Sequence, residues 1–206
     1  MRLSQVMLLD QEDVILIHKG TNCLVALGSN QEWEGKASQD LILEAISELS
    51  ENGLIISKVS RLFRTPCFPR DAGPDFVNAA LMLNTVIAPD RLMVILHDLE
   101  SKRGRVRRKR WDSRTLDIDL LSYGDLILPD RQSFEKWRCL DIDLQQKSAP
   151  ENLILPHPRL QERAFVLGPL MDVAPNWCHP VLEKTVEEMY FSLPVCVRNE
   201  LEVLSL

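Results

Sequence analysis

The sequence lacks cysteine pairs. Its five cysteines are odd in number and scattered along the chain: Cys23, Cys67, Cys139, Cys178 and Cys196. Because no CxxC spacing occurs among them, neither a disulfide framework nor a zinc site is indicated. This pattern favours the reducing environment of the cytosol.

The sequence also lacks a hydrophobic run long enough to span a bilayer. Its first twenty residues contain apolar stretches, but acidic residues interrupt them, unlike the continuous apolar part of a signal peptide. No internal repeat or low-complexity tract occurs. We therefore expect a soluble cytoplasmic protein without a membrane partner.

The composition is ordinary for one globular domain. A chain of 206 residues with 45% hydrophobic and 26% charged residues can bury a full core, whereas two domains would be a tight fit. We expect a single domain over residues 1–206.

One segment concentrates positive charge in a chain whose formal net charge is −6. Between Lys102 and Arg114 lie eight of the 24 basic residues and a single acid, Asp112. An acidic body with one cationic loop argues against a general nucleic-acid-binding surface and favours a local site for a polyanion.

The cationic segment leads directly into the stretch RTLDIDLL, residues 114–121. In an extended strand Asp117 and Asp119 would point to the same face, while apolar side chains line the other. Two neighbouring carboxylates repel each other and raise each other's pKa unless a cation lies nearby. The spacing therefore predicts a bound cation. In the free protein, without this cation, replacing either aspartate by asparagine should leave the stability unchanged or raise it.

The order of apolar patterns predicts an α+β fold. Strands are expected at residues 23–28, 54–63, 76–85 and 115–124, and helices at residues 37–49 and from Pro89 onward. The order β-α-β-β-α-β is that of a ferredoxin-like sheet with helices on one face. Helical and hairpin additions are expected after it.

The segment 129–152 is polar, and we interpret it as an insertion. It contains a second short DID motif, Asp141 to Asp143. No cationic cluster adjoins this motif and its hydrophobic flanks are weak, so both aspartates are expected on the surface.

Four segments together resemble the signature segments of 6-hydroxymethyl-7,8-dihydropterin pyrophosphokinase, an enzyme family of folate biosynthesis. They are ALGSN (26–30), RTPCF followed by PDFVNAAL (64–81), GRVRRKRWDSRTLDIDLL (104–121) and LPHPRLQERAFVLGPL (155–170). The similarity covers about residues 22–191 and keeps the family's order. Residues 1–21 are then an N-terminal extension, and residues 129–152 an insertion.

The resemblance implies that the pyrophosphoryl group of ATP moves to the hydroxymethyl oxygen of the pterin, with release of AMP. Asp117 and Asp119 match the family's metal-binding aspartates, so two Mg²⁺ ions are expected. Mg²⁺ prefers oxygen ligands and neutralises the charge that develops on phosphate oxygens during transfer.

Four of the eight cationic residues in the segment 102–114 match the family's residues for catalysis and ATP binding. The resemblance implies a catalytic set of Arg105, Arg107, Arg110, Trp111 and Arg114. It implies an ATP-binding set of Glu100, Arg107, Arg110, Arg114, His157 and Arg163. Guanidinium groups present forks of donors to phosphate oxygens, so several of them on a flexible segment can enclose ATP. No strong candidate for a general base is evident, which suits a reaction governed by positioning.

The pterin-binding set that the resemblance implies comes from several segments: Asn30, Thr65, Pro66, Phe68, Phe76, Asn78, Trp111 and Phe165. Phe76 and Phe165 match the pair that stacks on the flat ring, and Asn78 matches the amide that binds the ring edge. Taken singly, each phenylalanine is more typical of a core residue, so only the whole set supports this interpretation.

Three positions depart from the family pattern. Ser113 and Cys67 stand where prolines are usual, and Asn152 stands where many relatives carry an arginine that contacts phosphate. We expect looser loops at the first two positions and an altered affinity for ATP.

Two other functions fit part of the sequence. A ferredoxin-like RNA-binding module would use the arginine-rich segment, but it predicts aromatic residues on the central strands, and TLDIDLL has none. A metal-dependent nucleotidyl transferase would release pyrophosphate instead of AMP. We expect small-molecule substrates, no nucleic-acid partner and a monomer.

Overall fold

A six-stranded antiparallel sheet organises the chain, of which the computed structural model describes residues 20–67, 73–104, 114–141, 144 and 149–205. The strands are β1 (Thr21–Ser29), β2 (Ile55–Val59), β3 (Phe63–Thr65), β4 (Phe76–Thr85), β5 (Asp117–Tyr123) and β6 (Glu202–Val203). Their order is β5-β1-β4-β3-β6, and β2 pairs with β4. The predicted α+β class is confirmed.

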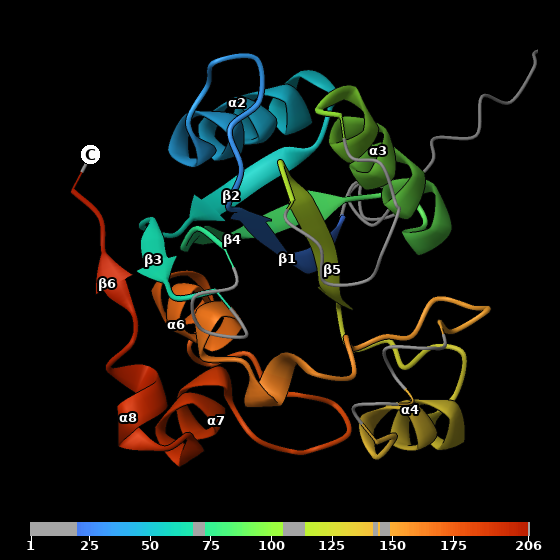
Figure 1. The fold of residues 1–206 in the computed structure, drawn as a ribbon. Helices are drawn as coiled ribbons and strands as arrows, with labels where there is room; N and C mark the ends of the chain where they lie inside the picture. The colour runs from blue at the N-terminus through green and yellow to red at the C-terminus, as the bar shows by residue number, and fades with distance from the viewer. Residues whose placement is uncertain (1–19, 68–72, 105–113, 142–143, 145–148, 206) are drawn as a thin grey trace, which may run out of the picture.

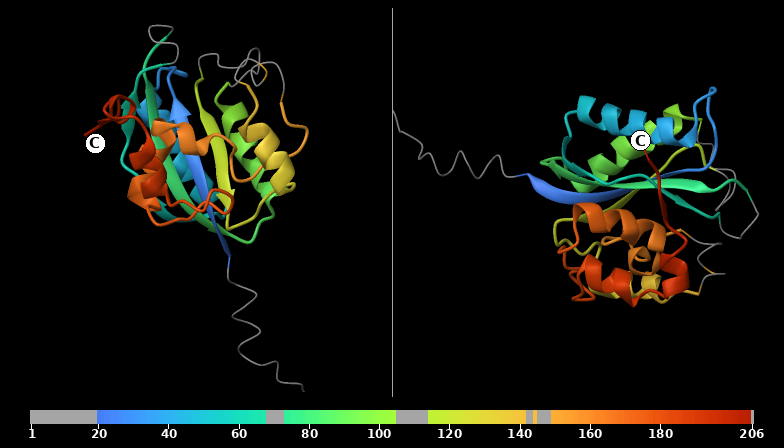
Figure 2. Two further views of the ribbon diagram at one scale, coloured as in Figure 1. Left: turned by 90° about the horizontal axis from the view of Figure 1, so that it is seen from below. Right: turned by 90° about the vertical axis from the view of Figure 1, so that its left-hand side faces the viewer.

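Helices cover both faces of this sheet (Figures 1 and 2). The helical elements are α2 (Ser38–Glu51), α3 (Pro89–Lys102), α4 (Arg131–Arg138), the 3-10 helix η1 (Leu160–Glu162), α6 (Ala164–Val173), α7 (Val186–Ser192) and α8 (Val195–Arg198). Helices α2 and α3 lie on one face, and α6, α7 and α8 lie on the other. The sheet therefore has a core on each side, and the two faces can carry different residues.

Apolar spacing explains how each core forms. Leu41, Ala45 and Leu49 recur on one side of α2 and are buried, together with the inward residues of β1 and β4. The second core joins Leu24 of β1 and Leu121 of β5 to the apolar side of α6. Helix α2 and the C-terminal helices thus pack on opposite faces of the same strands and stabilise them.

The prediction of one strand over residues 54–63 is wrong, because β2 and β3 are separate. Between them the Ser60 hydroxyl accepts a hydrogen bond from Ala80 N at 2.8 Å. Arg61 binds the carboxylate of Asp172 on α6. Its backbone amide donates to this carboxylate at 3.0 Å, and its guanidinium donates to it at 2.8 Å. This contact joins residues far apart in the sequence, so local apolar patterning could not reveal the interruption.

The polar segment 129–152 contains a packed helix, α4. The Asp130 side chain caps this helix by accepting from Ser133 N at 2.8 Å, and Phe134 is fully buried. Asp141 is exposed as predicted, whereas Asp143 lies outside the described residues. In the part of the chain that the structure describes, no helix is long and apolar enough to cross a membrane.

The buried ring of His179 connects α4 to the C-terminal layer. It lies 5.3 Å from the Phe134 ring and 5.6 Å from the Trp177 ring, measured between centroids. Its Nδ1 accepts hydrogen bonds from Val181 N and Leu182 N, both at 3.2 Å. Burial lowers the pKa of His179 to about 4, so the imidazole is neutral at physiological pH.

We expect acid to weaken the fold through His179. Its folded pKa of about 4 lies below the ordinary value of 6.5, so the unfolded chain binds the proton first as the pH falls. The free energy of unfolding should therefore decrease between pH 6.5 and 4, by roughly 3 kcal/mol from this group. Urea titrations of wild type and His179→Asn at several pH values measure the effect.

The matched control is His97→Asn on α3, which also removes an imidazole. The pH dependence of stability should flatten in His179→Asn and persist in His97→Asn. Equal pH dependence in wild type and His179→Asn would contradict the assignment.

Candidate active site

The register of three strands brings the candidate residues to one face of the sheet. Asp117 of β5 pairs with Gly28 of β1, which pairs with Asn78 of β4. Asp119 pairs with Ala26, further along β1. Directly opposed residues in antiparallel strands share a face, so both carboxylates and the amide lie on the side of the C-terminal helices.

The two residues opposite the aspartates, Gly28 and Ala26, have almost no side chain, so Asn78 and Phe76 of β4 can approach β1 closely. A Cβ atom added to Gly28 would lie 3.3 Å from Asn78 Oδ1 and 3.9 Å from a ring carbon of Phe76. Gly28 and Ala26 were not recognised from the sequence, because they carry no reactive group. Only the strand register shows that they separate the acidic residues from the amide.

Each aspartate has an arginine beside it. Arg114 Nη1 donates to Asp117 Oδ2, and Arg163 Nη1 lies 3.8 Å from Asp119 Oδ2. These side chains supply the positive charge that the Asp-x-Asp spacing predicts. The paired carboxylates are also the oxygen donors that a divalent cation such as Mg²⁺ prefers, so Asp117 and Asp119 could hold one.

His157 lies just beyond the aspartate-bearing strand. Its backbone amide donates to Leu121 O at 2.8 Å, which ties it to β5. Its Nδ1 accepts from Arg159 N at 3.2 Å, so a proton on the neutral ring is carried by Nε2. Burial, reinforced by the charge of Arg163, lowers the pKa of His157 to about 3. His157 is therefore a neutral hydrogen-bond donor.

Arg163 stands at the N-terminus of α6 and strengthens the positive potential there. Burial lowers the pKa of its guanidinium, while Asp119 opposes this shift. Its guanidinium carbon lies 5.6 Å from the ring centroid of Phe165, which is 42% exposed. A helix N-terminus with an adjacent guanidinium favours an anion, so this end of α6 suits a phosphate group.

Two buried asparagines order the opposite side of the site. Asn78 Nδ2 donates to Thr65 Oγ1 at 2.9 Å, across the pair of strands β3 and β4. Asn30 Oδ1 accepts from Arg114 N at 2.9 Å, and its Nδ2 donates to Pro74 O at 3.1 Å. Asn30 therefore joins three loops, and Asn78 is fixed with its amide close to Gly28.

The loop after β3 carries further candidates. Pro66 is half-buried, and Phe76 at the start of β4 is half-buried opposite Thr65. Cys67 Sγ donates to Gly73 O at 3.0 Å, so the thiol closes this loop where the family pattern has proline.

The remaining predicted residues cannot be placed at the site by the structure. Phe68, Arg105, Arg107, Arg110, Trp111 and Ser113 lie outside the described residues. Asn152 is exposed.

Comparison with known proteins identifies the family. A model described as 7,8-dihydro-6-hydroxymethylpterin-pyrophosphokinase (HPPK) matches residues 24–175. The chain belongs to the HPPK family.

Relatives agree with this assignment. A 2-amino-4-hydroxy-6-hydroxymethyldihydropteridine pyrophosphokinase from Synechocystis is 33% identical over 151 residues, covering 73% of this chain and 67% of that relative. A protein of the same name from Pseudomonas aeruginosa is 39% identical over 153 residues, covering 74% of this chain and 80% of that relative. The crystal structure of Plasmodium falciparum HPPK-DHPS has a TM-score of 0.58 and 18% identity, and it supports the fold alone. The match covers 84% of this chain and only 44% of that longer one.

Glu100, a predicted ATP-binding residue, lies on α3, on the other face of the sheet from Asp117 and Asp119. Its side chain comes from α3, is only 1% exposed and accepts from Ile118 N at 2.7 Å through Oε1. Ile118 lies between the two aspartates on β5. The geometry thus favours a role in holding the aspartate-bearing strand.

We expect Asp117→Asn and Asp119→Asn to differ in the stability of the free HPPK chain. Asp117 is shielded and bonded to Arg114, so its replacement should lower the free energy of unfolding by about 1 kcal/mol. This replaces the expectation from the sequence that both variants would be equally stable or more stable, which left the Arg114 partner out of account. Asp119 is more exposed and only loosely paired with Arg163, so its replacement should change this energy by less than about 0.5 kcal/mol. Urea titrations of both variants measure the difference. A clear gain in stability for both would show that repulsion between the carboxylates is unrelieved.

Proposed function

We propose that this chain transfers the pyrophosphoryl group of ATP to the hydroxymethyl group of 6-hydroxymethyl-7,8-dihydropterin, releasing AMP, in folate biosynthesis. The observation that carries the proposal is the row Asp117, Gly28 and Asn78 across three strands, with cationic side chains beside the carboxylates. Membership of the HPPK family and relatives named as the pyrophosphokinase support it.

The phosphates of ATP would bind on the cationic side of the site. Arg114, Arg163 and the Nε2–H group of His157 offer donors there, and the start of α6 adds its partial positive charge. Arg105, Arg107, Arg110 and Trp111 are proposed to act with them. The contribution of these groups is orientation and charge stabilisation, because transfer to a hydroxyl group requires the two substrates to be aligned.

Asp117 and Asp119 are proposed to hold Mg²⁺, with two ions expected beside the triphosphate. When bound, the metal would neutralise negative charge on the phosphate oxygens that are transferred. Arg114 and Arg163 would then be released from their carboxylate partners toward the phosphates, so the same four side chains serve the free and the bound protein.

The pterin would bind over Gly28, on the side of Asn78. Phe76 and Phe165 are proposed to stack on its two faces, and Asn78 to bind its polar edge. Phe165 is exposed at the start of α6, which is unusual for a core phenylalanine and fits an aromatic side chain that a ligand covers. Thr65, Pro66, Phe68, Asn30 and Trp111 are proposed to complete the pocket.

We also propose one domain over residues 1–206, built on a ferredoxin-like βαββαβ unit. The order β5-β1-β4-β3 of its antiparallel strands supports this description. The segments 1–21 and 129–152 would be additions to that unit, although α4 gives the second a packed helix.

The decisive test incubates the protein with ATP, Mg²⁺ and 6-hydroxymethyl-7,8-dihydropterin, and identifies the products by mass spectrometry. Equal amounts of AMP and a diphosphorylated pterin are expected. Release of pyrophosphate with a nucleotidyl adduct would favour a nucleotidyl transferase. Magnesium-independent binding of RNA, without either product, would favour the RNA-binding module.

Substitution of either aspartate should remove both the activity and the thermal stabilisation that ATP with Mg²⁺ gives. Asp117→Asn and Asp119→Asn should lower turnover by several orders of magnitude and abolish the stabilisation that ATP with Mg²⁺ gives to wild type. Thermal melts with and without ATP and Mg²⁺ measure this. A variant that still gains stability from ATP with Mg²⁺ would place the metal elsewhere.

Phe165→Ala should weaken pterin binding about ten- to hundredfold and leave ATP binding nearly unchanged, because one stacking face is lost. Phe191→Ala on α7 is the matched control, since Phe191 is also exposed, at 56% against 42% for Phe165. Calorimetry with each ligand compares the variants. Equal losses for pterin and ATP in Phe165→Ala would mean that this ring does not stack on the pterin.

A further inference from the structure

A buried hydrogen bond joins Arg103, just before the segment 105–113, to Thr115, just after it. Thr115 Oγ1 donates to Arg103 O at 2.6 Å, and both residues are buried. The described residues on the two sides of this segment are therefore held next to each other.

The guanidinium of Arg103 anchors the first end. It donates to Glu48 Oε2 of α2 at 2.9 Å and to Leu99 O of α3 at 3.2 Å. Its side chain is 9% exposed, so the ion pair is largely protected from water. Removing Glu48 leaves the buried guanidinium of Arg103 without its carboxylate, which makes this anchor more costly to break than an exposed ion pair. Removing Arg103 leaves Glu48 with its second partner, Lys102, at 2.5 Å.

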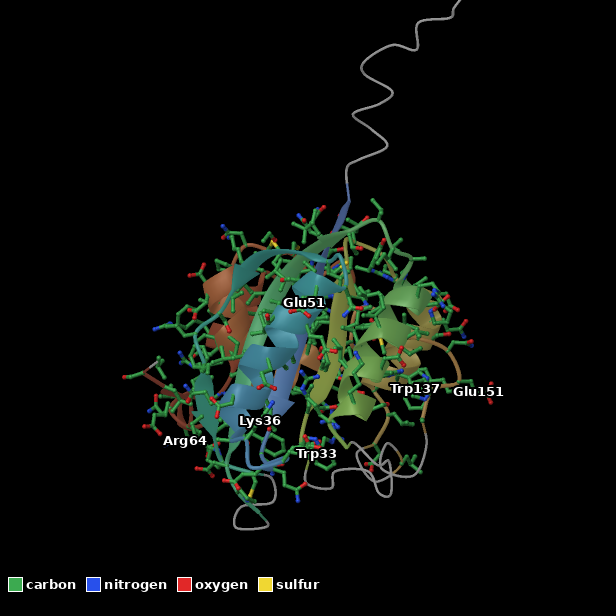
Figure 3. All side chains as sticks on the ribbon, turned by 90° about the horizontal axis from the view of Figure 1, so that it is seen from above. Trp33, Lys36, Glu51, Arg64, Trp137 and Glu151 are labelled. Carbon is green, nitrogen blue, oxygen red and sulfur yellow. The ribbon has the colours of Figure 1, made fainter. Side chains whose placement is uncertain are left out.

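The indole of Trp33 holds the adjacent Gly104. A Cβ atom added to Gly104 would lie 2.2 Å from two ring carbons of Trp33, so the ring packs directly on the glycine backbone. Gly104 also has φ +71°, which other residues adopt at a cost. Trp33 is itself fixed by paired backbone bonds with Lys36, of 3.1 and 2.9 Å. Figure 3 shows both residues at the same end of α2, away from Glu51.

The loop between β1 and α2 also holds the second end. Asn30 N donates to Arg114 O at 3.0 Å, and Asn30 Oδ1 accepts from Arg114 N at 2.9 Å. One loop therefore contacts Gly104 through Trp33 and Arg114 through Asn30.

We propose that Glu48, Arg103 and Trp33 are positioning residues for ATP binding, because they fix where the arginine-rich segment begins. This inference rests on the proposed function, in which Arg105, Arg107 and Arg110 contact phosphates. Fixing the ends of a loop reduces the conformational entropy that its side chains lose when they bind a ligand. Glu48, Arg103 and Trp33 thus act through the segment and touch no substrate.

The test compares Glu48→Gln, Arg103→Gln and the double variant. The matched control is Glu44→Gln, because Glu44 also lies on α2 and pairs with Lys36 at 2.7 Å, but is exposed. Trypsin cleavage after Arg105 to Arg110, followed by mass spectrometry, measures how firmly the ends are held without relying on activity. Steady-state kinetics measure KM for ATP, KM for the pterin and kcat.

Each single variant should be cleaved about tenfold faster than wild type and should raise KM for ATP about five- to tenfold, as expected for loss of one charged hydrogen bond. KM for the pterin should stay within about twofold. The double variant should show a smaller effect than the sum of the two single variants, because Glu48 and Arg103 share one ion pair. Trp33→Ala should raise KM for ATP similarly, and Trp33→Phe should restore most of the loss.

Equal cleavage and equal KM for ATP in Glu48→Gln and Glu44→Gln would overturn the inference. Faster cleavage with unchanged KM for ATP would also overturn it, since the ends would be held for a purpose other than ATP binding. If wild type releases no AMP, the proposed function fails, whereas the cleavage comparison still shows whether the ion pair holds the segment. Arg103→Lys, which keeps the charge, should retain most of the protection in a folded protein.

Discussion

The register of β1 between β4 and β5 is the constraint on which the site depends. A shift of one residue in either pairing would turn Asp117 and Asp119, or Asn78, to the opposite face, because neighbouring residues of a strand point to opposite sides. The cores on both faces hold this register, since the same shift would expose the inward residues of β1. Burial of apolar residues thus fixes the arrangement of the polar ones.

Charge balance is the second constraint. The aspartates, two arginines and a neutral histidine lie within one region, and the arginines satisfy the carboxylates of the free protein. The neutral state of His157 matters here, because a third positive charge beside Arg163 would oppose burial of both groups. The site can therefore be assembled before any ligand is bound.

Much of the fold and part of the site could be predicted from the sequence, and the reasons differ between elements. The bounds of β4 were predicted because its apolar run is interrupted only by Asn78 and is flanked by turn residues, and Pro89 marked the start of α3. The split between β2 and β3 could not be predicted, since it depends on the distant partner Asp172. The Asp-x-Asp pair was evident from its spacing, whereas the approach of Asn78 to Gly28 depends on pairing between strands. The sequence predicted a cation beside the aspartates but could not show that Arg114 lies against Asp117 in the free protein.

The carboxylate of Glu100 has a consequence for association between chains. By accepting from Ile118 N, it occupies a backbone donor on the outer edge of β5, where another strand could otherwise add to the sheet. On the opposite side β6 covers β3. Among the described strands the other edges are β6, which is only two residues long, and β2, whose pairing is irregular between Ile56 and Lys58 and which presents a lysine. Edge-to-edge aggregation is thus discouraged at β5 by a residue that also steadies the strand carrying Asp117 and Asp119.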